Sequence, residues 1–194
     1  GLALERLAVG RARGASVTAL IIITIGASIF LRGVASLVWD KKLHALAPFS
    51  GDTPIAFGGA TILPQSLWVL GATVVIVAAL AFFFNRTRLG KAMLATAYNG
   101  LAAELVGIGV RRMLALALGL AAALGALAGI LIAPITLTSY DVGVMLGLKG
   151  FAAAILGGLG SGTGAIAGGI VLGLVESLAA GYVSSAYKDV IAFA

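Results

Sequence analysis

Long uncharged stretches recur along the chain and are separated by shorter charged ones. Residues 14–31, 67–84 and 113–133 form three such runs, of 18, 18 and 21 residues. A helix needs about 20 apolar residues to cross a bilayer, and helix tilt or long basic side chains at its ends accommodate small differences in length. The pattern therefore predicts three spanning helices, at about 14–35, 67–84 and 113–134.

A fourth apolar region, residues 142–182, is interrupted by glycine. Its only charged residues are Lys149 and Glu176, and residues 157–164 contain five glycines in eight positions. Each glycine inside a helix costs about 1 kcal/mol relative to alanine. We therefore expect two membrane helices, at about 142–157 and 164–182, joined by a tight glycine turn at a membrane face or against a partner, where its backbone is satisfied.

The stretch 33–66 carries prolines and turn residues, and it is expected to lie outside the membrane. Within it, alternating apolar residues flank Gly58 and Gly59 in the segment 55–63. That pattern favours a short β-hairpin. The alternative is a disordered loop, and the single histidine, His44, is expected to be solvated there.

Loop charge predicts the orientation of the helices. Residues 85–112 hold five basic residues against one glutamate, a balance of +4, and residues 1–13 hold three arginines against one glutamate. The charges of 33–66 sum to zero. Basic loops stay on the cytoplasmic side, so the N-terminal end and 85–112 are predicted inside, and 33–66 outside.

The basic stretch 88–108 also has an apolar stripe with helical spacing. Asn99 and Gly100 form a turn signal in its middle, which favours two short helices meeting at a bend. Such a pair suits docking of another subunit, and it equally suits an interfacial helix on lipid headgroups. The stripe consists of Leu89, Met93, Ala97, Leu101, Leu105 and Ile108.

Composition agrees with a membrane protein. Apolar residues make up 61% of the chain and charged residues 10%, against about 25% charged in soluble domains. There is no cysteine, and His44 stands alone, so no Cys- or His-based metal site is expected and no cofactor is predicted. The net charge of +6 is read as loop charge rather than as a nucleic-acid footprint.

Polar residues inside the apolar regions are candidates for a translocation path. Lys149 and Glu176 are intramembrane charges, which suggest function by default. They either form an ion pair across the glycine turn or reach loops and headgroups separately. Thr24 and Ser28 lie four residues apart on one helix face, where they either line a polar path or bond their own helix carbonyls.

Small residues recur four apart at Gly125/Gly129, Gly164/Gly168 and Gly169/Gly173. This spacing lets helix backbones approach closely. The motifs indicate either static packing or an interface that slides during transport.

Several strings resemble the LivH type of branched-chain amino acid ABC transporter permease. The resemblance runs in the family's order over nearly the whole chain, although Tyr98-Asn99-Gly100 departs from the acidic or amide pair usual before Ala102-Ala103. The strings are Glu5-Arg6-Leu7, Thr24-Ile25-Gly26, 87–92 (TRLGKA), Ala95, Ala102-Ala103, Gly107-Ile108, 150–161 (GFAAAILGGLGS), Gly164-Ala165, Gly168-Gly169 and Tyr187-Lys188-Asp189.

The apolar runs and the composition together predict an all-α integral membrane protein, a polytopic bundle with about five membrane helices in residues 1–194. The resemblance implies a protein of a bacterial or archaeal cytoplasmic membrane. Its implied partners are a second permease subunit, two cytoplasmic ATP-binding subunits and a periplasmic or extracellular substrate-binding protein. The residues implied to couple the chain to the ATPases are Arg88, Gly90, Asn99, Gly100, Ala102, Gly107, Gly157, Gly158, Gly160 and Ser161.

Two other classes remain as rivals to this transport subunit. A channel or secondary transporter would work without ATPases, and a structural scaffold would leave the bent basic loop without a task. The sequence has no G-x-x-x-x-G-K-[ST] motif to hold ATP phosphates, so ATP hydrolysis is expected on partner subunits. The chain starts at Gly1 and stops at Ala194 where an apolar run begins, and it is expected to be a piece of a longer protein.

Overall fold

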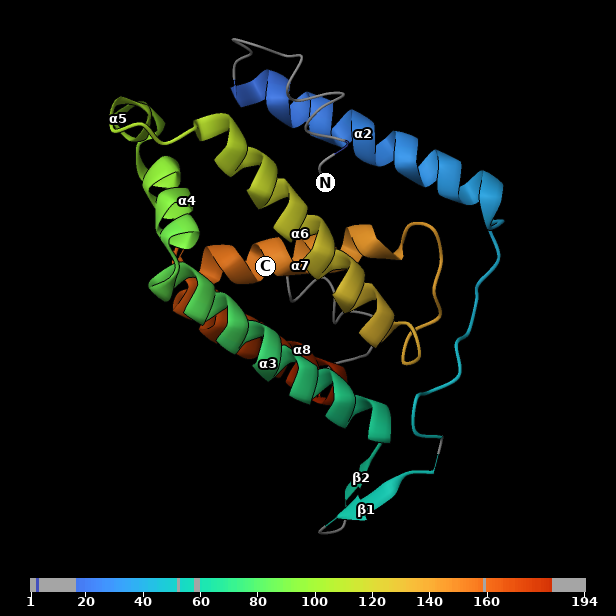
Figure 1. Cartoon of the computed structure of the whole chain (residues 1–194). Helices are drawn as coiled ribbons and strands as arrows, with labels where there is room; N and C mark the ends of the chain where they lie inside the picture. The colour runs from blue at the N-terminus through green and yellow to red at the C-terminus, as the bar shows by residue number, and fades with distance from the viewer. Residues whose placement is uncertain (1–2, 4–16, 52, 58–59, 159, 183–194) are drawn as a thin grey trace. The chain divides into compact units, whose positions relative to one another are not determined.

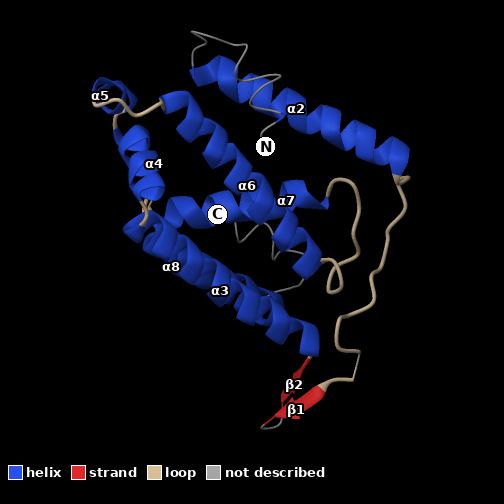
Figure 2. Ribbon diagram, in the orientation of Figure 1, coloured by secondary structure: helices blue, strands red, loops and turns tan. Residues whose placement is uncertain are grey.

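A computed structural model describes residues 3, 17–51, 53–57, 60–158 and 160–182. It forms two compact units, residues 1–140 and 141–194, which are described separately. Apart from one small hairpin, the described part of the chain is built of helices (Figure 2).

The described part of the first unit contains five helices and one two-stranded hairpin, in order along the chain. Helix α2 is followed by a hairpin, by the long helix α3, by the short helices α4 and α5, and by the long helix α6 (Figure 1). Their bounds are α2 Val17–Val38, β1 Ile55–Phe57, β2 Ala60–Ile62, α3 Pro64–Arg86, α4 Arg88–Tyr98, α5 Gly100–Leu105 and α6 Val110–Ile132.

The second unit is a helical hairpin of α7, Val142–Leu156, and α8, Gly162–Tyr182. The two helices pack against each other along their length. The prediction of two helices folded about a glycine turn is confirmed.

The helices begin and end close to the predicted runs, but not at the same residues. Helix α3 begins at Pro64 rather than at 67, because proline suits the first turn of a helix, where its missing N–H is not needed. Helix α6 begins at Val110 rather than at 113, because Arg111 and Arg112 belong to its first turn. The expected residues 14–16 lie outside the described part.

Three described helices are long and apolar enough to cross a membrane: α3, α6 and α8. Shorter apolar helices lie at Ile22–Val38 and Val142–Leu156. Most large apolar side chains point outward, and the buried apolar residues are few: Ala103, Met113, Ala153, Leu172 and Ala179. Outward apolar faces suit contact with lipid or with other membrane helices.

The hairpin predicted in 55–63 is present. Strands β1 and β2 pair antiparallel, with Ile55 opposite Ile62 and Phe57 opposite Ala60. Its Gly58-Gly59 turn lies outside the described residues. The alternative of a disordered loop is wrong for the described residues 39–51, because hydrogen bonds hold them to the rest of the unit.

Candidate functional site

Helices α4 and α5 form a bent pair whose two starts are capped by side chains. Thr87 Oγ1 accepts a hydrogen bond from the N–H of Gly90 at 3.0 Å and donates to the Phe83 carbonyl at 2.6 Å. Asn99 ends α4, and its Oδ1 accepts from the N–H of Ala102 at 3.0 Å. Thr and Asn are preferred caps because their oxygens satisfy free helix N–H groups. The bend predicted at Asn99-Gly100 is confirmed.

The start of the bent pair lies directly on the end of α3. A Cβ added to Gly90 would overlap the carbonyl oxygen of Phe83 and would lie 2.7 Å from the Cα of Phe84. Only glycine lets the two backbones meet this closely. The sequence reasoning singled out Gly90, and the structure gives it this packing role.

The end of α5 is closed by a left-handed glycine. Gly107 has a φ of +84° and donates to the Glu104 carbonyl, while Ile108 donates to the carbonyl of Ala103. This pair of bonds is the Schellman arrangement that commonly ends helices. Ala103 is only 3% exposed, and α4 and α5 both pack against α6, so the bent pair is fixed to both long helices.

The bend carries an exposed apolar patch, which consists of Tyr98, Leu101, Leu105 and Val106. Leu101 is 73% exposed. The predicted single stripe over 88–108 is wrong in detail, because Met93 and Ile108 are half-buried while other members face outward. The bend at Asn99 breaks the helical period on which the stripe was counted.

The glycine turn of residues 157–164 needs its glycines for two reasons. Gly158 and Gly160 have φ values of +89° and +93°, a region that favours glycine. A Cβ on Gly157 or on Gly164 would overlap the carbonyl oxygen of the other. Ser161 Oγ accepts from the N–H of Gly164 at 3.1 Å and so caps the start of α8.

One of the three small-residue motifs makes a helix contact in this structure. Gly168 is buried against α7, and a Cβ on it would overlap the carbonyl oxygen of Ala153. Gly169, next in sequence, has open space instead. The other two motifs, Gly125/Gly129 and Gly169/Gly173, likewise have no heavy atom within 4 Å of an added Cβ.

Lys149 of α7 and Glu176 of α8 form an ion pair within the second unit. Lys149 Nζ lies 2.5 Å from Glu176 Oε1, and the side chains are 19% and 22% exposed. The alternative, that the two charges reach loops or headgroups separately, is wrong. The long lysine side chain spans the two helices because the glycine turn brings them close.

Thr24 and Ser28 are both exposed on α2. The Ser28 carbonyl accepts from Arg32 Nε at 3.4 Å. A role for Thr24 and Ser28 in a translocation path remains a prediction.

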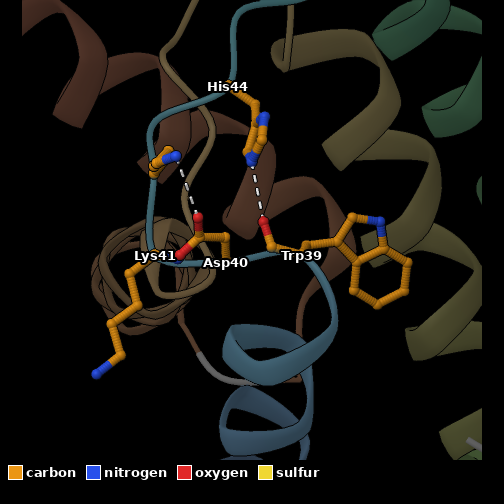
Figure 3. A network of polar contacts seen from close by, with 5 residues as sticks. Trp39, Asp40, Lys41 and His44 are labelled. Carbon is orange, nitrogen blue, oxygen red and sulfur yellow. Dashed lines mark hydrogen bonds and ion pairs between the residues drawn. The ribbon is translucent and has the colours of Figure 1, made fainter.

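His44 lies in a turn after α2 that is held by local polar contacts (Figure 3). Its Nε2 donates to the Trp39 carbonyl at 3.0 Å, and the N–H of Lys41 donates to Asp40 Oδ1 at 2.7 Å. The backbone of His44 also exchanges two hydrogen bonds of 2.9 Å with Thr138. His44 is exposed, as expected of a solvated loop residue, and its backbone in addition joins two segments that are distant in sequence.

Comparison with known proteins decides the family. The model of the family described as branched-chain amino acid transport system / permease component matches residues 4–194. The chain belongs to this family. The resemblance found in its motifs is confirmed, and so is the fold class: this family member is a helical integral membrane protein with several apolar helices.

Named relatives of this chain include two proteins that are similar over its whole length. It is 35% identical over 202 residues to the high-affinity branched-chain amino acid transport system permease protein LivH of Escherichia coli (strain K12), covering all of the chain and 65% of that protein. It is 34% identical over 199 residues to BraD of Pseudomonas aeruginosa, which carries the same description, covering all of the chain and 64% of BraD.

A more distant relative carries another substrate in its name. The L-arabinose transport system permease protein AraH of Escherichia coli (strain K12) is 28% identical over 166 residues, which cover 81% of the chain and 49% of AraH. The chain thus spans just under two thirds of the length of its first relatives. No solved structure matches it.

One residue of the candidate site could not be found from the sequence. Gln65, in the first turn of α3, is buried and bonds two segments that are distant in sequence. Its only local signal is a polar residue at the edge of an apolar run, which is common at helix ends. The contacts depend on tertiary structure, so no spacing rule finds them.

Proposed function

We propose that this chain is the membrane-spanning permease subunit of an ABC importer for branched-chain or related amino acids. It works in a bacterial or archaeal cytoplasmic membrane with a second permease subunit, two cytoplasmic ATP-binding subunits and a substrate-binding protein. ATP hydrolysis takes place on the partner subunits, and this chain carries out no covalent chemistry. The names of its relatives support the class of substrate.

One observation carries the proposal: the bent pair α4–α5 is exposed at its bend and rigidly joined at its base. Gly90 packs against the backbone of α3, while α4 and α5 pack against α6. A partner that moves the patch of Tyr98, Leu101, Leu105 and Val106 therefore moves two long helices. The exposed basic residues that flank the bent pair, in 86–91 and 111–112, suit a cytoplasmic position.

The residues of this coupling role fall into two groups. In the bent pair, helix caps and close packing fix the geometry. In the glycine turn of 157–164, the left-handed backbone conformations of Gly158 and Gly160 fix it. We assign to the ATPase-facing surfaces Arg88, Gly90, Asn99, Gly100, Ala102 and Gly107, and in the turn Gly157, Gly158, Gly160 and Ser161.

The substrate path takes its polar groups from the apolar helices. An amino acid crosses as a zwitterion, so opposite charges and hydroxyl groups suit its two ends. We assign Lys149, Glu176, Thr24 and Ser28 to the path. The assignment is supported by the partial exposure of the ion pair and by the exposure of Thr24 and Ser28 on α2.

The orientation follows from loop charge, with α4–α5 inside and the segment 39–63 outside. Because the sequence contains no cysteine, single cysteines introduced into it are informative probes. Leu101→Cys should react with a membrane-impermeant maleimide only in inverted vesicles, and Leu46→Cys only in intact cells. The opposite pattern contradicts the orientation.

Reconstitution of the full-length protein tests the function. Proteoliposomes that hold the permease subunits, with and without the ATPases, are supplied with binding protein and radiolabelled leucine. We expect uptake only when ATPases and internal ATP are both present. Uptake without ATPases would instead identify a channel or secondary transporter.

A further inference from the structure

Gln65 is a buried polar side chain in the first turn of α3. Its residue is 2% exposed, which makes it the polar residue best shielded from solvent among those the structure describes. Buried amides are expensive unless they are hydrogen-bonded. The partners of Gln65 therefore show what its burial achieves.

Both ends of the Gln65 amide are used, and by different segments. Its Oε1 accepts from the N–H of Phe49 at 3.2 Å, and its Nε2 donates to the carbonyl of Leu131 at 3.0 Å. Leu131 lies in the last turn of α6. The N–H of Ile135 donates to the Ile132 carbonyl and not to the Leu131 carbonyl, as it would in a continuing α-helix. Gln65 thus supplies from α3 a donor for the end of α6.

Two further contacts hold the same region. Trp68 Nε1 donates to Ser50 Oγ at 2.8 Å, one turn along α3 from Gln65. His44 and Thr138 exchange two backbone hydrogen bonds, although 94 positions separate them. Residues 44–50 are therefore fastened both to the start of α3 and to the chain that follows α6.

The opposite ends of α3 and α6 are joined by the bent pair α4–α5, as Figure 1 shows. Each long helix has 23 residues and is about 35 Å long. The two helices are thus tied at one end through Gly90 and α5, and at the other through Gln65. Contacts at both ends restrict tilting of α3 relative to α6.

We infer that Gln65 is a positioning residue for transport. It makes α3, α6 and residues 44–50 move as one body, so that a displacement received at the bent pair reaches the far ends of the helices. The source of that displacement, a partner ATPase, rests on the proposed function. We call α3, α6 and the residues bonded to Gln65 and Trp68 the frame; its rigidity rests on the hydrogen bonds described above.

A rigid frame transmits a displacement in either direction, from the bent pair to the outer side or from the outer side to the bent pair. A substrate-loaded binding protein on the outer side should stimulate ATP hydrolysis on the inner side through it. Gln65→Met keeps the side-chain length and leaves the Phe49 N–H and the Leu131 carbonyl without their partner. The ratio of stimulated to basal ATP hydrolysis should then fall.

The test uses the complete transporter with the full-length chain in proteoliposomes. Residues that carry coupling change it by about two- to thirty-fold, and we expect Gln65→Met to lower the ratio within that range. Thr73→Val is the matched control, because it removes a side-chain hydrogen bond that stays within α3, to Val69. It should leave the ratio unchanged.

Other roles give other results. A residue that only stabilises the fold lowers the amount of assembled transporter and leaves the ratio intact, so an intact ratio in Gln65→Met overturns the inference. If Gln65→Met does not assemble, Gln65→Asn carries the test, since its amide is one methylene too short to bond both Phe49 and Leu131; a ratio equal to wild type again overturns the inference. Failure of the proposed function is distinct: wild-type protein then shows no ATP-dependent uptake.

Discussion

Lys149 and Glu176 face each other across two apolar helices, with 2.5 Å between the ammonium nitrogen and a carboxylate oxygen. The glycine turn between their helices makes this contact possible, because Gly157, Gly164 and Gly168 allow the backbones to touch. The small residues therefore bring the two helices close enough for an ion pair of low exposure to form.

Breaking the pair should destabilise the permease more than removing it. Glu176→Gln leaves a charged lysine among apolar helices, at a cost of about 3 kcal/mol. Adding Lys149→Met to Glu176→Gln removes that charge and should restore part of the stability. The measurement is the thermal unfolding midpoint of the full-length protein in detergent, for wild type, both single variants and the double variant. A double variant no better than Glu176→Gln argues against the pairing.

Gly90→Ala should loosen the base of the bent pair. The added methyl group overlaps backbone atoms of Phe83 and Phe84, and such overpacking costs about 1–3 kcal/mol. Gly71→Ala is the control, because Gly71 lies in α3, the helix against which Gly90 packs, with open space around it, and should gain up to about 1 kcal/mol from alanine. Stability and ATP-dependent uptake are measured for both. Equal behaviour of the two variants would refute the close approach at Gly90.

Gly168→Ala and Gly169→Ala should differ sharply although they are neighbours. The first places a methyl group against the Ala153 carbonyl, and the second places it in open space. We expect only Gly168→Ala to reduce the fraction of protein that stays monodisperse in size-exclusion chromatography after heating. If both variants or neither lose this fraction, α7 and α8 do not cross at Gly168.

Asn99→Ala should open helix α5 locally. The lost cap costs about 1 kcal/mol, so amide hydrogen exchange in α5 should rise about fivefold. Asn99→Asp keeps an oxygen that accepts from Ala102 and should exchange like wild type. Exchange in α8 serves as an internal reference. An unchanged rate in Asn99→Ala means that the cap does not hold the bend.

Local features of this fold were predictable because their causes are local. Uncharged runs predicted the long helices, five glycines predicted the turn at 157–164, and Asn99 predicted the bend. Helices α3 and α6 begin three residues before the predicted positions. Counting uncharged residues leaves Pro64, Arg111 and Arg112 in loops, but proline and arginine are tolerated in the first turn of a helix.

Contacts between distant segments were not predictable in the same way. The partners of Gln65 lie 16 and 66 positions away, and His44 bonds to Thr138. No periodicity connects such residues, and only the folded chain brings them together. The Lys149–Glu176 pair stands between these cases, since helix rise allowed it but did not require it.

The central claim is that partner ATPases drive this permease through its bent helix pair. Leu101→Asp tests it, because Leu101 is 73% exposed at the bend and a carboxylate there disrupts apolar docking without disturbing a buried core. Leu46→Asp, at a residue that is 58% exposed, is the control for retention of the ATPases during purification. In proteoliposomes with internal ATP, the account predicts that Leu101→Asp loses both the ATPases and leucine uptake, while Leu46→Asp keeps its ATPases. Retained ATPases and wild-type uptake in Leu101→Asp would contradict it.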